Sequence, residues 1–425
     1  MRRLRGLLAD TRPLQTPAYR RLFTAQIVTV IGAQLTVVTV PAQIYSMTGS
    51  SAYVGLTGLF GLVPLVVFGL YGGSLADHLD RRRLLTVTTW GLIITSALFF
   101  AQAALGNTNV WLLLAVFALQ QACFAVNQPT RSAVLPRILP PEQLPAANAL
   151  NMTVFTGGAI AGPLVGGALI PLLGFSWLYL VDTILLFATL WAVLSLPPLR
   201  VEPAAGSSPG IRSVIDGFVY LATQPALLMS FVIDLVAMVF GMPRALIPEM
   251  ADADFGGPAQ GGTAFALLFA AMPVGAFLGG VLSGWVSRVE RQGLAVIIAI
   301  LVWGAAIVGL GTAVALADGT MMPFLAVALV FFAIGGAADV ASAAFRSTML
   351  QSAATDTMRG RLQGVFIVVV AGGPRVADVL HGLVAGQLGT AMTTILGGAL
   401  VIVLTLVLAV TVPAFARYRV PPATS

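Results

Sequence analysis

Long apolar runs alternate with short polar segments along nearly the whole chain. A helix needs about 20 apolar residues to cross the hydrocarbon core of a bilayer, and most of these runs reach that length. They predict twelve membrane-spanning helices, over residues 22–45, 53–72, 84–105, 110–130, 146–170, 176–196, 226–249, 263–287, 293–316, 323–345, 361–388 and 391–413. An even number of spans places both chain ends on the same side of the membrane. The predicted fold class is therefore all-α and polytopic.

Composition supports a membrane protein and narrows the chemistry. The 425 residues are 58% hydrophobic and 9% charged, whereas soluble domains carry about 25% charged residues. The single cysteine, Cys123, excludes a disulfide framework or a thiolate cluster. No residues have metal-ligand spacing and no glycine-rich loop follows a strand, so we expect no metal, no nucleotide cofactor and no enzymatic activity. Residues 1–21 lack the apolar core of a cleavable signal peptide.

The positive charges give the orientation. The net charge is +6 and every basic residue is arginine. The arginines gather in alternate loops, as cytoplasmic loops require, and form no continuous basic face that would bind nucleic acid. The loops predicted to lie outside carry Asp252, Asp254 and Asp318 instead. We therefore expect a multi-pass protein of the cytoplasmic (inner) membrane with both termini on the cytoplasmic side.

A proline-, serine- and glycine-rich segment divides the chain. It runs over residues 197–210, and a short amphipathic helix is predicted after it at 211–222, on the cytoplasmic surface. The predicted organisation is an N-terminal six-helix half (1–197), a linker (198–225) and a C-terminal six-helix half with a tail (226–425). The motif that begins at Arg131 after the fourth span returns at Arg346 after the tenth, which indicates that the halves repeat.

The elbow between the second and third predicted spans carries a motif. Its positions are Gly73, Asp77, Asp80, Arg81 and Arg82. It resembles the signature loop of the major facilitator superfamily, with Asp80 where most members have glycine, as in the branch of macrolide and enterobactin exporters. An ordinary positively charged loop is the alternative. The resemblance implies two pseudo-symmetric six-helix halves with substrate held between them near the midplane.

The resemblance also implies a mechanical role for the elbow. Asp77 would meet the positive N-terminal end of the eleventh span, at Gly360 and Arg361, and the elbow arginines would complete the cluster. Such a lock would hold the cytoplasmic side closed while the cavity faces outward.

The fifth span contains Gly157, Gly162, Pro163, Gly166 and Gly167. This pattern resembles the antiporter motif of the superfamily, which marks exporters. Close helix packing alone is the alternative interpretation, because small residues let transmembrane helices approach one another.

Ionisable residues inside spans are the strongest candidates for function, since each costs roughly 2.5 kcal/mol or more at the centre of a helix in lipid. In the superfamily, spans one, four, seven and ten line the cavity. Span seven contains Asp234 and Arg244, and span ten contains Asp339. A carboxylate in a dry cavity can bind and release a proton near neutral pH, so Asp234 or Asp339 is a candidate proton carrier. A static ion pair with Arg244 or Arg346 is the alternative.

Span eleven contains a second set, Arg375, Asp378 and His381, on broadly one side. A proton relay is possible because histidine titrates near physiological pH, and an intrahelical Arg–Asp pair is the alternative. Gln34 and Gln120 are candidate polar groups of the cavity. Asp182 is expected to be a solvated or hydrogen-bonded residue at the end of a span.

Taken over nearly the whole chain, the sequence resembles the enterobactin (siderophore) exporter group and its macrolide and multidrug efflux relatives. The resemblance implies proton-coupled export of a small amphipathic molecule by a monomer in the lipid bilayer, driven by the proton gradient without another cofactor. A multidrug or macrolide antiporter, an uptake permease and a non-transporting membrane receptor are the alternatives.

Overall fold

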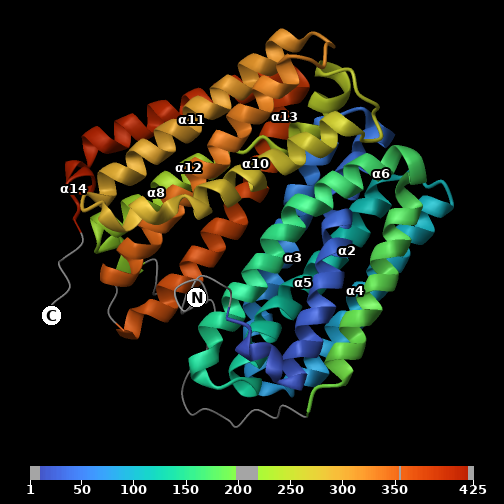
Figure 1. Cartoon of the computed structure of the whole chain (residues 1–425). Coiled ribbons are helices and arrows are strands. Elements are labelled where there is room, and N and C mark those ends of the chain that lie inside the picture. The colour runs from blue at the N-terminus through green and yellow to red at the C-terminus, as the bar shows by residue number, and fades with distance from the viewer. Residues whose placement is uncertain (1–9, 198–218, 354–355, 420–425) are drawn as a thin grey trace, which may run out of the picture. The chain divides into compact units, whose positions relative to one another are not determined.

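The computed structural model describes residues 10–197, 219–353 and 356–419, and within them the side chains of all but residues 70–78, 287 and 351–368. These residues form helices and turns, with no strand among them (Figure 1). The predicted linker and residues 211–218 of the predicted amphipathic helix lie outside this description, and residues 219–222 are helical.

The N-terminal part of the chain supplies five long helices. They are α2 (Pro17–Thr48), α3 (Ser51–His78), α4 (Arg81–Ala104), α5 (Val110–Ile138) and α6 (Leu144–Leu194), with the short 3-10 helices η1 (Arg12–Gln15) and η2 (Pro141–Gln143). The 51 residues of α6 are too many for one crossing. Gly174 breaks it with φ 75° and ψ 170°, a conformation that only glycine adopts readily. α6 therefore contains the predicted fifth and sixth spans.

The C-terminal part follows the same order with more interruptions. Its long helices are α8 (Pro225–Phe240), α10 (Thr263–Val281), α11 (Gln292–Ala317), α12 (Phe324–Ala353) and α13 (Asp356–Thr411). The short elements are η3 (Arg244–Leu246), α9 (Ile247–Glu249), the π-helical η4 (Met250–Asp254), η5 (Ser283–Arg288) and α14 (Pro413–Ala416).

The two parts break at equivalent places. Gly389 interrupts the 56 residues of α13 with φ 77° and ψ 167°, nearly the conformation of Gly174, and so separates the predicted eleventh and twelfth spans. Ten described helical segments are long and apolar enough to cross a membrane. Because α6 and α13 each contain two spans, the prediction of twelve spans is confirmed.

Two predicted spans are less regular than expected. Span seven was predicted to be continuous over 226–249, but α8 ends at Phe240 and the chain resumes in η3. Pro243 lacks an N–H and cannot continue the helix. Span eight was predicted to extend to 287, but its α-helix ends at Val281 and continues in the tighter η5.

Contacts divide the chain into two compact units. Unit 1 comprises Met1–Val40 and Val63–Gly210, and unit 2 comprises Pro41–Leu62 and Ile211–Ser425. The hairpin formed by the end of α2 and the start of α3 thus groups with unit 2. Both crossing points lie beside prolines inside helices, Pro41 and Pro64, where a helix bends most easily. The predicted six-helix halves, 1–197 and 226–425, are based on the repeat in the sequence, and they stay a prediction.

Each unit has its own buried core of aromatic and aliphatic side chains. The largest fully buried aromatic residues are Tyr19, Phe99 and Tyr179 in unit 1 and Phe255, Phe265, Phe345 and Phe415 in unit 2. In unit 1, Phe99 of α4 stacks on Tyr179 of α6 with ring centroids 5.1 Å apart, which fixes these helices side by side.

Candidate functional site

The elbow begins α4 with a capping residue. The side chain of Asp80 accepts hydrogen bonds from the backbone N–H of Arg82 (2.9 Å) and of Arg83 (3.2 Å). A helix start leaves such N–H groups without partners, and aspartate is among the best residues to satisfy them. Aspartate at a position where the superfamily usually has glycine therefore has a local structural reason.

The elbow arginines bind carbonyl groups of neighbouring helices in unit 1. Arg81 donates to the carbonyl of Ala133 in α5 (3.0 Å), and Arg82 donates to that of Leu194, the last residue of α6 (2.5 Å). The carbonyls that end a helix lack intrahelical donors, so an arginine is a favourable partner. The side chain of Asp77 lies outside the described residues, as do those of 360 and 361, so the predicted lock stays a prediction. Gly73 lies in α3.

The glycines of the fifth span pack against the first. A Cβ at Gly158 would overlap Val30 of α2, and one at Gly162 would overlap Gln34. Gly166 faces the same helix. Gly157 instead faces open space, so the packing position at the start of the motif is Gly158. Glycine on this face of α6 thus lets the side chains of α2 pack directly against the α6 backbone.

The other predicted polar and motif positions have different environments. Pro163 and Gly167 are buried within α6, and Gln120 is buried in α5. Gln34 is half-buried against Gly162. Asn127 donates to Thr88 of α4 (2.9 Å), which gives it a role in joining α4 and α5.

Asp182 is hydrogen-bonded and is not solvated. The sequence predicted a solvated or hydrogen-bonded residue at the end of a span, and only 1% of Asp182 is exposed. It accepts hydrogen bonds from Thr36 of α2 (2.8 Å) and Ser96 of α4 (2.9 Å), and Thr183 donates to Ser96 (3.0 Å). Among the side chains that the structure describes in unit 1, no arginine pairs with it. Gly32 lies directly against its second carboxyl oxygen. Asp182 is thus a buried acid held by hydroxyl groups of two other spans.

Unit 2 contains a buried ion pair between spans seven and ten. Arg346 of α12 pairs with Asp234 of α8, and their side chains are 4% and 1% exposed. Arg346 also donates from Nε to Ser342 (3.2 Å). Asp339 lies two turns before Arg346 on α12, near enough for both charges to act on it. The alternative of an ion pair with Arg346 describes the geometry of Asp234, and the carrier role of Asp339 stays a prediction.

A second ion pair joins spans seven and eleven. Arg244 in η3 donates to Asp378 of α13 at 2.7 Å. The partner found for Asp378 is thus in η3, and the intrahelical pair with Arg375 stays a prediction. Arg375 donates to the carbonyl of Ala371 in its own helix (3.1 Å).

His381 contacts the end of α8 at the break in span seven. Its Nε2 lies 3.0 Å from the carbonyl oxygen of Phe240, the last residue of α8. A carbonyl can only accept, so Nε2 carries the hydrogen in this contact. Pro243 prevents the helix from continuing, and an inserted polar side chain is a usual replacement for the lost backbone donor in a membrane. The geometry therefore gives His381 a structural role in addition to the predicted relay.

Acids near the end of span seven hold the hairpin that groups with unit 2. Tyr45 donates to Asp252 (3.1 Å), and the N–H of Ser51 donates to Glu249 (3.1 Å). We call these four residues the outer clasp. Further along α3, a Cβ at Gly55 would overlap the backbone carbonyl of Asp378, so the hairpin lies directly on α13.

The charged residues predicted inside spans thus form separate groups, which differ between the two units. In unit 2, Arg346 pairs with the acid of span seven, and Arg244 joins spans seven and eleven. In unit 1, one acid is held by hydroxyls. Buried acids inside spans often form proton relays. When such an acid binds a proton, its attraction to its partner weakens, and this can be coupled to a movement of the helices.

Comparison with known proteins identifies the class. The sequence profile of the transmembrane secretion effectors, a family of major facilitator type, matches residues 9–423. The chain therefore belongs to the transmembrane secretion effector family, and it is a transporter of the major facilitator fold.

Individual relatives agree with this assignment. The chain is 28% identical over 380 residues to the enterobactin exporter EntS of Shigella dysenteriae serotype 1 (strain Sd197), covering 89% of this chain and 87% of that protein. The same figures hold for the enterobactin exporter EntS of Escherichia coli O139:H28 (strain E24377A / ETEC).

Solved structures show the same fold at low identity. The nucleoside transporter NupG matches with a TM-score of 0.70 and 14% identity, covering 95% of this chain and 100% of that one. The peptide transporter POT in complex with sulfate matches with a TM-score of 0.75 and 14% identity, covering 95% and 96%.

Proposed function

We propose that this protein exports a small amphipathic molecule, a siderophore of enterobactin type, across the cytoplasmic membrane. The observation that carries the proposal is the match to enterobactin exporters along 89% of this chain and 87% of theirs. The glycine face of α6 on α2 supports it, because the sequence motif there resembles that of antiporters. Both chain ends lie on the cytoplasmic side in this proposal, and the arginine distribution supports this orientation.

The transport is driven by the proton gradient, with Asp234 or Asp339 as the proton carrier. The buried pair of Asp234 with Arg346 supports this role, since protonating the acid would release the arginine for Asp339 or for an anionic substrate group. Through such an exchange, proton binding would move α12. The protein acts as a monomer and needs no cofactor besides the gradient.

Secretion under iron starvation tests the function. Deleting the gene should lower the catecholate siderophore in the medium and raise it inside the cell, and the wild-type gene should restore secretion. Asp77→Asn should restore it poorly if the elbow forms the lock. Unchanged secretion would contradict the proposal and favour multidrug or macrolide efflux, to be tested next with a panel of macrolides, tetracyclines and dyes.

Inverted membrane vesicles test direction and coupling. Energised inverted vesicles should accumulate a catecholate siderophore if the protein is an exporter, and accumulation in right-side-out vesicles would indicate an uptake permease. The double variant Asp234→Asn/Asp339→Asn should lose substrate-dependent proton flux. Asp318→Asn is the matched control, because Asp318 is exposed and its left-handed backbone (φ 43°) suits asparagine. Full proton dependence in the double variant would contradict the assignment of the carrier.

A further inference from the structure

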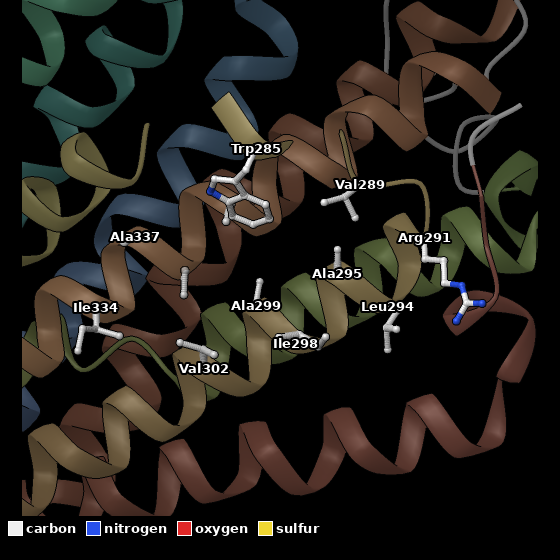
Figure 2. A pocket seen from close by; sticks show the side chains of 12 residues that line it. Trp285, Val289, Arg291, Leu294, Ala295, Ile298, Ala299, Val302, Ile334 and Ala337 are labelled. Carbon is white, nitrogen blue, oxygen red and sulfur yellow. The ribbon is translucent and has the colours of Figure 1, made fainter. Parts of the chain in front are cut away.

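A groove of about 510 Å³ runs along unit 2 where α11 and α12 lie side by side (Figure 2). Leu294, Ile298 and Val302 line one wall, at intervals of four residues that place them on one stripe of α11. Trp285 of η5 and Ile334 of α12 line the other. The volume falls within the range of about 300–1,000 Å³ that is usual for small-molecule sites.

The groove has room for a ligand because several of its lining residues are alanines, whose side chains are small. Ala295 and Ala299 on α11 and Ala341 on α12 lie between the longer side chains of the walls. Of the twelve described lining residues, only Arg291 and the indole of Trp285 carry polar side-chain atoms. A polar ligand would lose its hydrogen bonds to water here without replacement, which costs free energy. A hydrocarbon chain would lose none.

Positive charge lies at one end. Figure 2 shows Arg291 at the end of the groove opposite Ile334. Arg288, the last residue of η5, is exposed nearby in the sequence, and the acid between them, Glu290, is 82% exposed and pairs with Arg419 at 4.0 Å. The loop that contains these arginines is predicted to be cytoplasmic. The groove therefore has an apolar body inside the membrane and a cationic end at the cytoplasmic surface.

We propose that this groove binds an anionic phospholipid of the cytoplasmic leaflet. One acyl chain lies between α11 and α12, and the phosphate lies against Arg291. An arginine fork matches phosphate oxygens with two parallel hydrogen bonds. The cytoplasmic leaflet supplies anionic lipids, and basic pockets between helices on that side hold their headgroups. A flat apolar surface with no charge would contact any lipid equally, whereas this groove discriminates by headgroup charge.

Lipid retention by the purified full-length protein tests the proposal. Phosphatidylglycerol and phosphatidylcholine with identical acyl chains are added in detergent, and native mass spectrometry counts the bound copies. The wild type should retain phosphatidylglycerol in preference. Arg291→Gln should weaken phosphatidylglycerol retention about fivefold, the effect of one charge near the surface, and should weaken phosphatidylcholine less, because its choline group already neutralises the phosphate, so the preference for phosphatidylglycerol falls. Arg137→Gln is the matched control, since Arg137 is an exposed arginine at the end of α5.

Filling the groove gives a second, independent test. Ala295→Phe should remove retention of the lipid, whereas Val330→Phe, on an exposed part of α12 outside the groove, should not. Equal retention of both lipids by the wild type would overturn the proposal, as would unchanged retention in Ala295→Phe. If Ala295→Phe instead converts a dimer to a monomer, or if a catecholate siderophore displaces phosphatidylglycerol, the occupant is a second copy or the substrate and the lipid site is refuted.

Discussion

We predict that Asp234 and Asp339 can replace one another as the negative charge that balances Arg346. Asp234 and Arg346 are almost completely buried, so solvent screens their attraction little. Removing one partner of a buried pair costs about 3–5 kcal/mol, because the remaining charge is left uncompensated. In Asp234→Asn, however, Asp339 can still balance the guanidinium. We therefore expect a loss of about 1–2 kcal/mol for either single variant, within the usual range for point mutations.

The double variant should lose more than the sum of the two. Asp234→Asn/Asp339→Asn leaves Arg346 with neither acid, so the full cost of about 3–5 kcal/mol should appear. The coupling energy would then be about 1 kcal/mol, inside the range seen for residues that share a partner.

Unfolding in mixed detergent micelles measures these free energies. Tryptophan fluorescence can follow the transition, since the chain has six tryptophans. Asp318→Asn again serves as the control for loss of an acid without a buried partner. Additivity of the two substitutions within about 0.5 kcal/mol would refute the reasoning, because it would show that Asp339 does not share Arg346.

Three further substitutions test the packing around the site. Asp182→Ala should destabilise the protein by about 1–3 kcal/mol, because two buried hydroxyls lose their acceptor, while Asp182→Asn should cost less; equal losses in an unfolding assay would contradict this. Tyr45→Phe should remove the hydrogen bond to Asp252, cost about 1 kcal/mol, and raise labelling of a cysteine placed at Ser51; unchanged labelling would argue against the outer clasp. Asp80→Ala should cost about 1 kcal/mol and Asp80→Ser much less, as measured by thermal unfolding, and similar losses would exclude a capping role.

The sequence was a good guide to features that depend on local patterns. Apolar runs of the right length gave all twelve spans, because the bilayer imposes that length on every helix. It named Arg346 as a possible partner of Asp234, but it did not identify the hydroxyl groups that hold Asp182. Asp182 is 146 residues from Thr36 and 86 from Ser96, and periodicity along one helix carries no information about contacts at such separations. Pro243 is a sequence signal for the break in span seven, but it lies within a long apolar run that predicts a continuous helix.

The break in span seven explains the positions of two charged or polar groups, Arg244 and His381. The first span, α2, is by contrast one continuous helix of 32 residues, in which Pro41 removes one backbone donor without ending the helix. The seventh stops at Phe240, which exposes a carbonyl for His381 and directs Arg244 to Asp378. The break in the seventh span is therefore held by two side chains of span eleven, His381 and Asp378.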